Sequence, residues 1–273
     1  MNAASDALPP VPLIALLTDF GASEYAGVVK GVMAAIWPPA RFVDLSHDVG
    51  PHSVREGAWI LLESYRFFPP GTLFFAVVDP GVGTQRPAVA VESRRYRWVG
   101  PDNGLLFPAV EDDGPARIVN LPVSERASST FHGRDVFAPA AARWASGARL
   151  EDLGSVRREP LVPLRFYRRG WCGEVVRVDR FGNLITALTS PEGGPELPGR
   201  AGVTLLKRTE KGSWKRAAGP VPAVRVRTYG QAPPGALVVL TGSAGTLEVA
   251  RVGGSAAAML GGAVGDRVRF RWR

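Results

Sequence analysis

Short apolar runs alternate with amphipathic segments along about the first 150 residues, and this alternation constrains the fold more than any other feature. An unbroken apolar run suits a buried strand, whereas apolar residues that recur every three or four positions suit a helix. The run FFAVV is apolar throughout, as expected of a central strand covered on both faces. The predicted strands are 13–17, 41–45, 72–78, 88–91 and 96–99, and the predicted helices are 28–36, 53–68 with Ser53 as N-cap, and 137–145. This order predicts a Rossmann-like α/β domain.

The pattern changes after about residue 155, where REPLVPLRFYRRG forms a stretch rich in proline and arginine without periodicity. Beyond it, glycine and proline turns separate short strand candidates, which are 174–178, 184–188, 203–207, 223–227, 236–240 and 267–271. Residues 191–198 (PEGGPELP) are predicted to form a flexible loop. We therefore predict an N-terminal α/β domain over 1–158, a linker over 159–170, and a small, mostly antiparallel β domain or barrel over 171–273.

Charge and cysteine content narrow the class of protein. The net charge of +8 comes almost entirely from arginines. These are spread along the chain and not gathered in one dense block, so nucleic-acid binding is unlikely. Arginine pairs such as 157–158 and 168–169 are expected on solvated surface or in subunit contacts. The lone Cys172 can form no intrachain disulfide. The first twenty residues resemble neither a signal peptide nor a membrane anchor, so we expect a cytoplasmic protein.

Two N-terminal motifs each leave two interpretations open. Asp19 follows the first predicted strand, where open α/β sheets bind ligands, and its carboxylate could accept two hydrogen bonds from a ribose diol or cap the next helix. Residues 44–48 (DLSHD) offer two carboxylates and an imidazole, but their spacing matches no compact metal-ligand set. A hydrogen-bonded turn that fixes the end of the second strand is the favoured interpretation. His52 either lines a pocket or lies exposed.

The segment VDPGVGTQR delivers Asp79 from a buried strand into a glycine-rich loop, with Arg86 seven residues later. From spacing alone, a structural turn with a salt bridge and a catalytic pair are equally favoured. His132 precedes a predicted helix and titrates near neutral pH, so it becomes important only if the fold brings it near this pair. Asp102 and Asn103, in the turn GPDNG, are expected to hold backbone groups.

Two polar loops stand out in the C-terminal half. The first, VDRFGNL, carries Asp179, Phe181 and Asn183, which are groups that a purine nucleoside with a charged tail would use. The second, TGSAGTLEVA, carries Ser243 and leads into an apolar run. Taken singly, each loop is better explained as an ordinary hairpin turn.

In their order, these motifs resemble the S-adenosyl-L-methionine (SAM) hydroxide adenosyltransferase family, whose relatives include fluorinase and chlorinase. The resemblance runs from about residue 13 to 260 and rests on TDFG, VVKG, DLSH, VVDPGVG, GPDNG, FHGRDVFAPAAA, DRFGNLIT and GSAGTLEVA. It implies an N-terminal α/β domain, a C-terminal β-barrel-like domain, and a homotrimer with sites between one subunit's N-terminal domain and its neighbour's C-terminal domain. It also implies cleavage of SAM to adenosine and L-methionine, with neither a metal nor a cofactor.

The resemblance also implies a role for individual residues. Asp79, Arg86 and His132 match the triad with which the hydrolytic branch holds water or hydroxide, a triad that halogenases of the same fold lack. The substrate-binding roles implied are Asp19 for the ribose hydroxyls, Asp179 for the methionine amino group, Asn183 for the adenine, Phe181 for stacking on the base, Ser243 for the methionine carboxylate, and the backbone near Arg251 for the adenine edge.

The chemistry of the reaction is consistent with this triad. A sulfonium leaves as neutral methionine without a general acid, so only the nucleophile needs help. His132 could take a proton while Asp79 orients the pair, and Arg86, which stays protonated, could stabilise a forming hydroxide. Two departures from the halogenases, His52 and Ala244, concern substrate binding. A SAM-dependent halogenase and a non-catalytic SAM- or adenosine-binding module remain the alternatives.

Overall fold

The computed structural model of the chain describes residues 11, 13–190 and 199–273, and it divides into two compact units, 1–164 and 165–273. The domain limits predicted from the sequence remain a proposal. The predicted loop at 191–198 lies outside the described residues. No helix within the described ranges is long and apolar enough to span a membrane.

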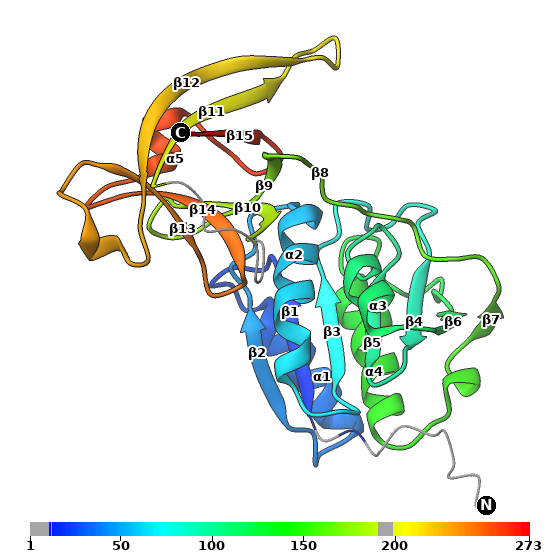
Figure 1. The fold of residues 1–273 in the computed structure, drawn as a ribbon. Helices are drawn as coiled ribbons and strands as arrows, with labels where there is room; N and C mark the ends of the chain where they lie inside the picture. Colours follow the sequence, from blue (N-terminus) through cyan, green and yellow to red (C-terminus); the bar gives the residue numbers. More distant parts are fainter. Residues whose placement is uncertain (1–10, 12, 191–198) are drawn as a thin grey trace, which may run out of the picture. The chain divides into compact units, whose positions relative to one another are not determined.

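The N-terminal unit is built around a seven-stranded sheet in the order β2-β1-β3-β5-β4-β6-β7 (Figure 1). Neighbouring strands from β2 to β5 are parallel, whereas β4, β6 and β7 add an antiparallel half. The strands are β1 (Ile14–Thr18), β2 (Phe42–Ser46), β3 (Leu73–Val77), β4 (Ala88–Glu92), β5 (Arg97–Pro101), β6 (Arg117–Asn120) and β7 (Ser155–Arg157). The predicted Rossmann-like α/β character is confirmed, and β6 and β7 are additions that the sequence pattern missed.

Helices cover both faces of this sheet, which is why β1 and β3 are buried along their whole length (Figure 1). α1 packs beside α4 on one face, and α2 packs beside α3 on the other. The helices are α1 (Tyr25–Ile36), α2 (Val54–Ser64), α3 (Phe107–Asp113) and α4 (Ala138–Ala145), with 3₁₀ turns at η1 (Tyr65–Phe67) and η3 (Leu150–Asp152) and a π turn at η2 (Gly133–Phe137). The predicted helices are therefore confirmed with shifted ends.

One local prediction in this unit is confirmed in position only, and another needs correction. Ser53 occupies the N-cap position of α2, but its side chain forms no capping bond. Instead, the Glu56 carboxylate in the first turn accepts a hydrogen bond from Gly50 N at 3.1 Å. Arg157, expected on solvated surface, has a side chain that is only 10% exposed and forms an ion pair with Asp102 at 2.7 Å. The prediction failed because the partner lies far away in the sequence.

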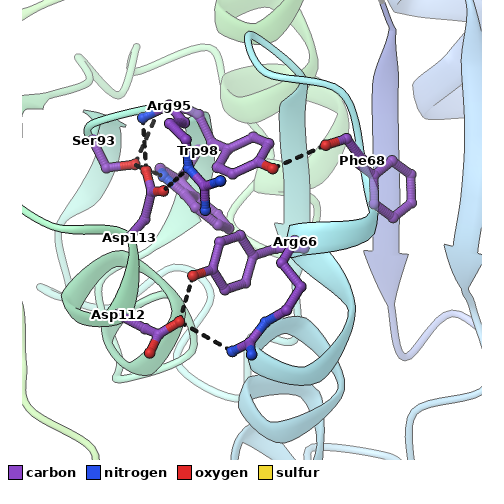
Figure 2. A network of polar contacts seen from close by, with 9 residues as sticks. Arg66, Phe68, Ser93, Arg95, Trp98, Asp112 and Asp113 are labelled. Atoms are coloured by element: carbon purple, nitrogen blue, oxygen red, sulfur yellow. Dashed lines mark hydrogen bonds and ion pairs between the residues drawn. The ribbon is translucent and has the colours of Figure 1, made fainter.

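A buried polar and aromatic network joins α3 to the amino ends of β3 and β5 (Figure 2). The buried Asp113 carboxylate accepts hydrogen bonds from Ser93 Oγ at 2.6 Å and from the Arg95 backbone at 2.8 Å. Trp98 Nε1 donates to the same Ser93 Oγ at 2.7 Å, and Tyr96 donates to the Phe68 carbonyl at 2.9 Å. This network therefore stabilises the end of the sheet that is opposite the carboxyl ends of the parallel strands.

The C-terminal unit is a closed barrel of seven strands in the order β10-β14-β13-β12-β11-β15-β9, with β9 pairing back to β10 and the short β8 added outside β9. All of these pairs are antiparallel except β12–β13. The elements are β8 (Arg168–Arg169), β9 (Cys172–Val178), β10 (Leu184–Thr189), β11 (Arg200–Arg208), β12 (Trp214–Arg225), η4 (Tyr229–Gln231), β13 (Leu237–Thr241), β14 (Thr246–Arg251), α5 (Ala256–Leu260) and β15 (Arg267–Trp272). Apolar side chains fill the barrel, so the predicted β-barrel-like domain is confirmed.

Candidate active site

The carboxyl ends of β1 and β3 form the switch point of the N-terminal sheet. The chain leaves β1 toward β2 on one side and leaves β3 toward β4 and β5 on the other, and open α/β sheets bind ligands at such a point. Asp19 follows β1 directly and Asp79 follows β3, and the two strands are paired in register through Thr18 and Val77. The fold therefore brings both predicted carboxylates to one edge.

Asp79, Arg86 and His132 form a connected set at this edge. Arg86 Nε donates to the Asp79 carboxylate at 2.8 Å, and Nη2 donates to the second carboxylate oxygen. Arg86 Nη2 also lies 3.1 Å from His132 Nδ1. The side chains of Asp79 and Arg86 are only 6% and 10% exposed, and His132 is buried. Arg86 thus stands between the acid and the imidazole, so Asp79 orients Arg86 and not His132.

Two glycines allow the loops that carry these residues to approach each other. Gly83 has φ of +76°, and a Cβ there would lie 2.3 Å from the Ser129 carbonyl oxygen in the loop before His132. Gly133 packs less tightly, and a Cβ there would lie 3.1 Å from the Phe131 ring and 3.3 Å from the Phe20 ring. The π turn that begins at Gly133 carries the chain from His132 into α4, and such turns recur at functional sites.

Replacing Gly83 by alanine is expected to separate Arg86 from His132. The change adds the cost of a positive φ, about 1–2 kcal/mol, and forces the Ser129 carbonyl to move. Gly212→Ala is the matched control, because Gly212 has φ of +79° and its Cβ would meet nothing closer than 3.7 Å. Urea unfolding should show a lower free energy of unfolding in both variants, whereas turnover of SAM should fall only in Gly83→Ala. Equal turnover in the two variants would contradict this role.

The surroundings of His132 keep its imidazole neutral. Burial, and then the positive charge of Arg86, lower the pKa of His132 below its usual value. Arginine nitrogens are donors only, so Nδ1 of His132, which faces Arg86, accepts a hydrogen bond. The ring proton of neutral His132 is therefore on Nε2, which is a donor. Arg86 Nη1 is a further buried donor, without a hydrogen-bond partner among the residues that the structure describes.

The turn after β2 contains the polar network expected of it. His47 Nδ1 lies 2.8 Å from Thr18 Oγ1, and its Nε2 lies 3.1 Å from Asp44. The backbone N–H of His52 donates to the Asp19 carboxylate at 2.9 Å, while the His52 side chain is exposed and its φ is +61°. Within the described ranges, no group of three or more His, Cys, Asp or Glu is arranged to hold a metal ion.

The predicted turn GPDNG holds backbone groups, as expected. Asp102 accepts a hydrogen bond from Val162 N at 2.8 Å, and the Asn103 side-chain amide donates to the Val78 carbonyl at 2.9 Å. Since Val78 lies between β3 and Asp79, Asn103 helps to fix the strand end from which Asp79 projects.

In the C-terminal unit, most of the predicted substrate-binding residues line one cavity of about 430 Å³. Its walls are Asp179, Phe181, Asn183, Tyr229, Arg251, Val252, Gly253 and Gly254. Phe181 is 70% exposed, whereas Asn183 is buried. Ser243 does not line this cavity and lies exposed in the turn between β13 and β14.

The turn between β9 and β10 shapes one wall of that cavity. Asp179 accepts hydrogen bonds from the backbone of Phe181 and Asn183, both at 2.9 Å, and from the Asn183 side chain at 2.9 Å. Gly182 has φ of +80° and packs against Ser255, with its carbonyl accepting a hydrogen bond from Ala257 N at 2.8 Å. Only glycine fits this contact, which fixes Phe181 and Asn183 on either side of it.

Comparison with known proteins identifies the family. The model of the SAM hydroxide adenosyltransferase N-terminal domain matches residues 14–154, and that of the C-terminal domain matches 173–269. The chain belongs to the SAM hydroxide adenosyltransferase family. It is 38% identical over 96% of its length to the (R)-S-adenosyl-L-methionine hydrolase of Salinispora tropica, and 41% identical over 93% to that of Thermus thermophilus, covering 98% and 97% of those proteins.

Two further matches are a fluorinase and a protein of known structure. The fluorinase of Nocardia brasiliensis is 29% identical over 64% of this chain and is covered over 70% of its own length. An uncharacterized conserved protein from Thermotoga maritima has the same fold, with a TM-score of 0.80, 33% identity, and coverage of 95% of this chain and all of that one.

The cavity of this SAM hydroxide adenosyltransferase also contains a residue that the sequence did not indicate. Tyr229, in η4, donates a hydrogen bond to the Glu248 carboxylate, and Glu248 is buried against Gly242. Burial raises the pKa of Glu248, and the negative charge of Asp179 raises it further. The hydrogen bond from Tyr229 lowers the pKa and so offsets part of this shift. An aromatic residue in a loop rich in glycine and proline was the available signal, but it has no spacing that marks a site.

Proposed function

We propose that this chain hydrolyses SAM at C5′ to adenosine and L-methionine. The C5′–S bond breaks with its electron pair leaving on sulfur, a C5′–O bond forms from a water oxygen, and that water gives up one proton to the solvent. Because the sulfonium leaves as a neutral thioether, the step calls for no Lewis acid or redox group, and we propose no cofactor. Relatives that are 35–41% identical are named (R)-S-adenosyl-L-methionine hydrolase, so we expect the (R)-sulfonium epimer to be preferred.

The observation that carries this proposal is the pair of donors left by Arg86 and His132. Arg86 Nη1 is buried without a partner among the described residues, and the ring proton of His132 is on Nε2. Two such donors suit a water oxygen that gains negative charge as it loses its proton. We therefore propose that both residues hold the nucleophile as hydroxide-like oxygen, with Asp79 fixing Arg86 by its paired hydrogen bonds. This role replaces proton acceptance by His132.

The substrate-binding residues keep the roles that the resemblance implies, as part of the same proposal. Asp19 has one carboxylate oxygen engaged by His52 N and retains acceptor capacity for ribose hydroxyls. Phe181, with its exposed ring, would stack on the adenine, and the buried Asn183 would bind its edge. The set is completed by three further contacts. Asp179 would bind the methionine amino group, the backbone near Arg251 the adenine edge, and Ser243 the methionine carboxylate. We further propose a cytoplasmic homotrimer with its sites at subunit interfaces, which light scattering would test.

The dependence of activity on pH should reflect the lowered pKa of His132. Protonation of Nδ1 would place a second donor against Arg86 and break their contact. We expect kcat/KM to stay level through neutral pH and to fall with an apparent pKa below about 6.5. The folded state binds this proton less readily than the unfolded state, so stability should also fall as the pH drops below about 6.5. His132→Gln should reduce that slope in urea unfolding, and an unchanged slope would contradict the assignment.

Product analysis distinguishes the proposed hydrolase from its alternatives. The protein is incubated with each sulfonium epimer of SAM, with and without molar chloride, and the products are separated by chromatography. We expect adenosine and methionine in equal amounts and no 5′-chloroadenosine. A halogenase would give 5′-chloroadenosine in chloride. Adenosine binding without adenosine formation above the uncatalysed background would identify a binding module and overturn the proposal.

A further inference from the structure

The positive charge of the chain is concentrated in one of its two compact units. Residues 165–273 contain 18 Lys and Arg against 7 Asp and Glu, a formal charge of +11, whereas residues 1–164 contain 15 against 18, a formal charge of −3. The arginines themselves are spread along the chain, with 14 in residues 1–164 and 15 in residues 165–273, and the asymmetry in net charge also comes from the small number of acidic residues in the barrel unit. An asymmetry of this size points to a polyanionic partner for the barrel unit.

The register of the barrel shows where part of this charge lies. On β15, the buried Val268 and Phe270 alternate with Arg269 and Arg271, which are exposed, so these arginines project from the outer face. Arg269 is paired with Cys172 on β9, and Cys172 is paired with Arg169 on β8. Residues directly opposite each other project on the same side of a sheet, so Arg169 and Arg269 share this outer face.

Aromatic rings adjoin these arginines at two points. The exposed Trp171 packs edge-on against Trp272, which faces the barrel core, with ring centroids 5.6 Å apart. Trp171 also lines a cavity of about 370 Å³ together with Arg168 and Arg169. Arg267, next along β15, has its guanidinium 3.3 Å from the Tyr167 ring centroid and 3.9 Å from that of Trp214. Arginines beside exposed rings are the combination that binds phosphates and stacks bases.

Carboxylates do not neutralise this part of the surface. In the described ranges, none of Arg168, Arg169, Arg269 and Arg271 takes part in an ion pair. The nearest acidic group in the strand register is Glu174, opposite Arg267, and it is 4% exposed and accepts a hydrogen bond from Tyr167 N at 3.0 Å. Four exposed guanidinium groups are therefore available to an anionic ligand.

We propose that this surface binds single-stranded nucleic acid. We call it the cationic face and define it as Arg169, Arg269 and Arg271 on the outer side of the strands, together with Arg168 and Trp171 around the adjoining cavity. The arginines would contact phosphates. The Trp171 indole, which lines the 370 Å³ cavity, would stack on a base. An acidic protein segment would satisfy the charges but would leave the ring without a planar partner, which favours the nucleic acid. The proposal does not depend on hydrolysis of SAM.

The test is fluorescence anisotropy with a 5′-fluorescein-labelled, mixed-sequence RNA of 20 nucleotides, titrated with the full chain at 50 and 200 mM KCl. We expect binding that weakens steeply with salt. Arg269→Gln/Arg271→Gln should weaken binding about tenfold or more at 50 mM KCl and reduce the salt slope. Trp171→Ala should weaken binding about fivefold or more at both salt concentrations.

Arg94→Gln/Arg126→Gln is the matched control, because both arginines are exposed in the N-terminal unit and the change in net charge is the same. This control should bind within about twofold of the parent chain. Equal weakening in the control, or absence of binding at 50 mM KCl, would overturn the proposal. If the Arg269→Gln/Arg271→Gln variant instead changes the molar mass in light scattering, the face contacts a second copy and the proposal fails. Circular dichroism checks that each variant is folded.

Discussion

Replacing His132 by alanine is expected to lower kcat for SAM hydrolysis by about 10²–10³ while leaving adenosine binding intact. The change removes one of two donors to the nucleophilic oxygen, and donors of this kind typically contribute that much to turnover. The affected group is buried beside Arg86 in the N-terminal unit, and it is not among the described residues that line the C-terminal cavity. Turnover is measured with saturating SAM, and adenosine affinity by calorimetry.

His132→Gln distinguishes the two chemical roles of the imidazole. A glutamine amide donates a hydrogen bond but does not take up a proton near neutral pH. If His132 acts as a donor, the glutamine variant should recover at least about tenfold of the lost kcat. If His132 is a general base, glutamine and alanine should be equally inactive. A parallel loss of adenosine binding would instead make His132 a substrate ligand.

Breaking the pair of Asp79 and Arg86 is expected to destabilise the fold and abolish turnover. Asp79→Ala leaves a buried guanidinium without its carboxylate, and Arg86→Met leaves a buried carboxylate without its cation. Each single change should cost about 3–5 kcal/mol in the free energy of unfolding. The double variant removes both charges, so its cost should be well below the sum of the two. Urea unfolding measures these costs, and product analysis measures turnover.

The double variant separates stability from catalysis. We expect it to be folded and inactive, since the donor at Arg86 Nη1 is gone. Arg126→Met, at an exposed arginine, is the control. It should change the free energy of unfolding by no more than about 0.5 kcal/mol and turnover by no more than about twofold. A double variant that hydrolyses SAM at the parent rate would show that the pair has a structural role only. Additive destabilisation would show that the two side chains do not interact in solution.

Much of the secondary structure could be predicted, because it is encoded by local patterns. The apolar run 72–78 contains β3, which is one residue shorter at each end, and the run 13–17 corresponds to β1 displaced by one residue. Strand β14 was missed because Thr246 and Glu248 are polar and the preceding TGSAG sequence suggests a loop. Thr246 and Glu248 are nevertheless buried in the barrel, and the register of β13 against β14 places them. Prediction from local polarity therefore misses strands whose polar side chains are buried inside the fold.

The candidate site depends on contacts that no local pattern encodes. Arg86 and His132 are 46 residues apart, and only the close approach at Gly83 brings their loops together. The sequence identified the three side chains, but it did not indicate that Arg86 lies between the other two. The ion pair between Arg157 and Asp102 was missed for the same reason. Ion pairs between distant loops become visible only when the topology is known.

Hydrolysis of SAM in H₂¹⁸O tests the central claim most directly. If water attacks C5′ in a single displacement, mass spectrometry should find one ¹⁸O atom in the 5′-hydroxyl of adenosine and none in methionine. Arg86→Met and His132→Ala, assayed in parallel, should show little labelled product. Adenosine without ¹⁸O, or a labelled product cleaved at another bond, would contradict direct attack by water held at Arg86 and His132.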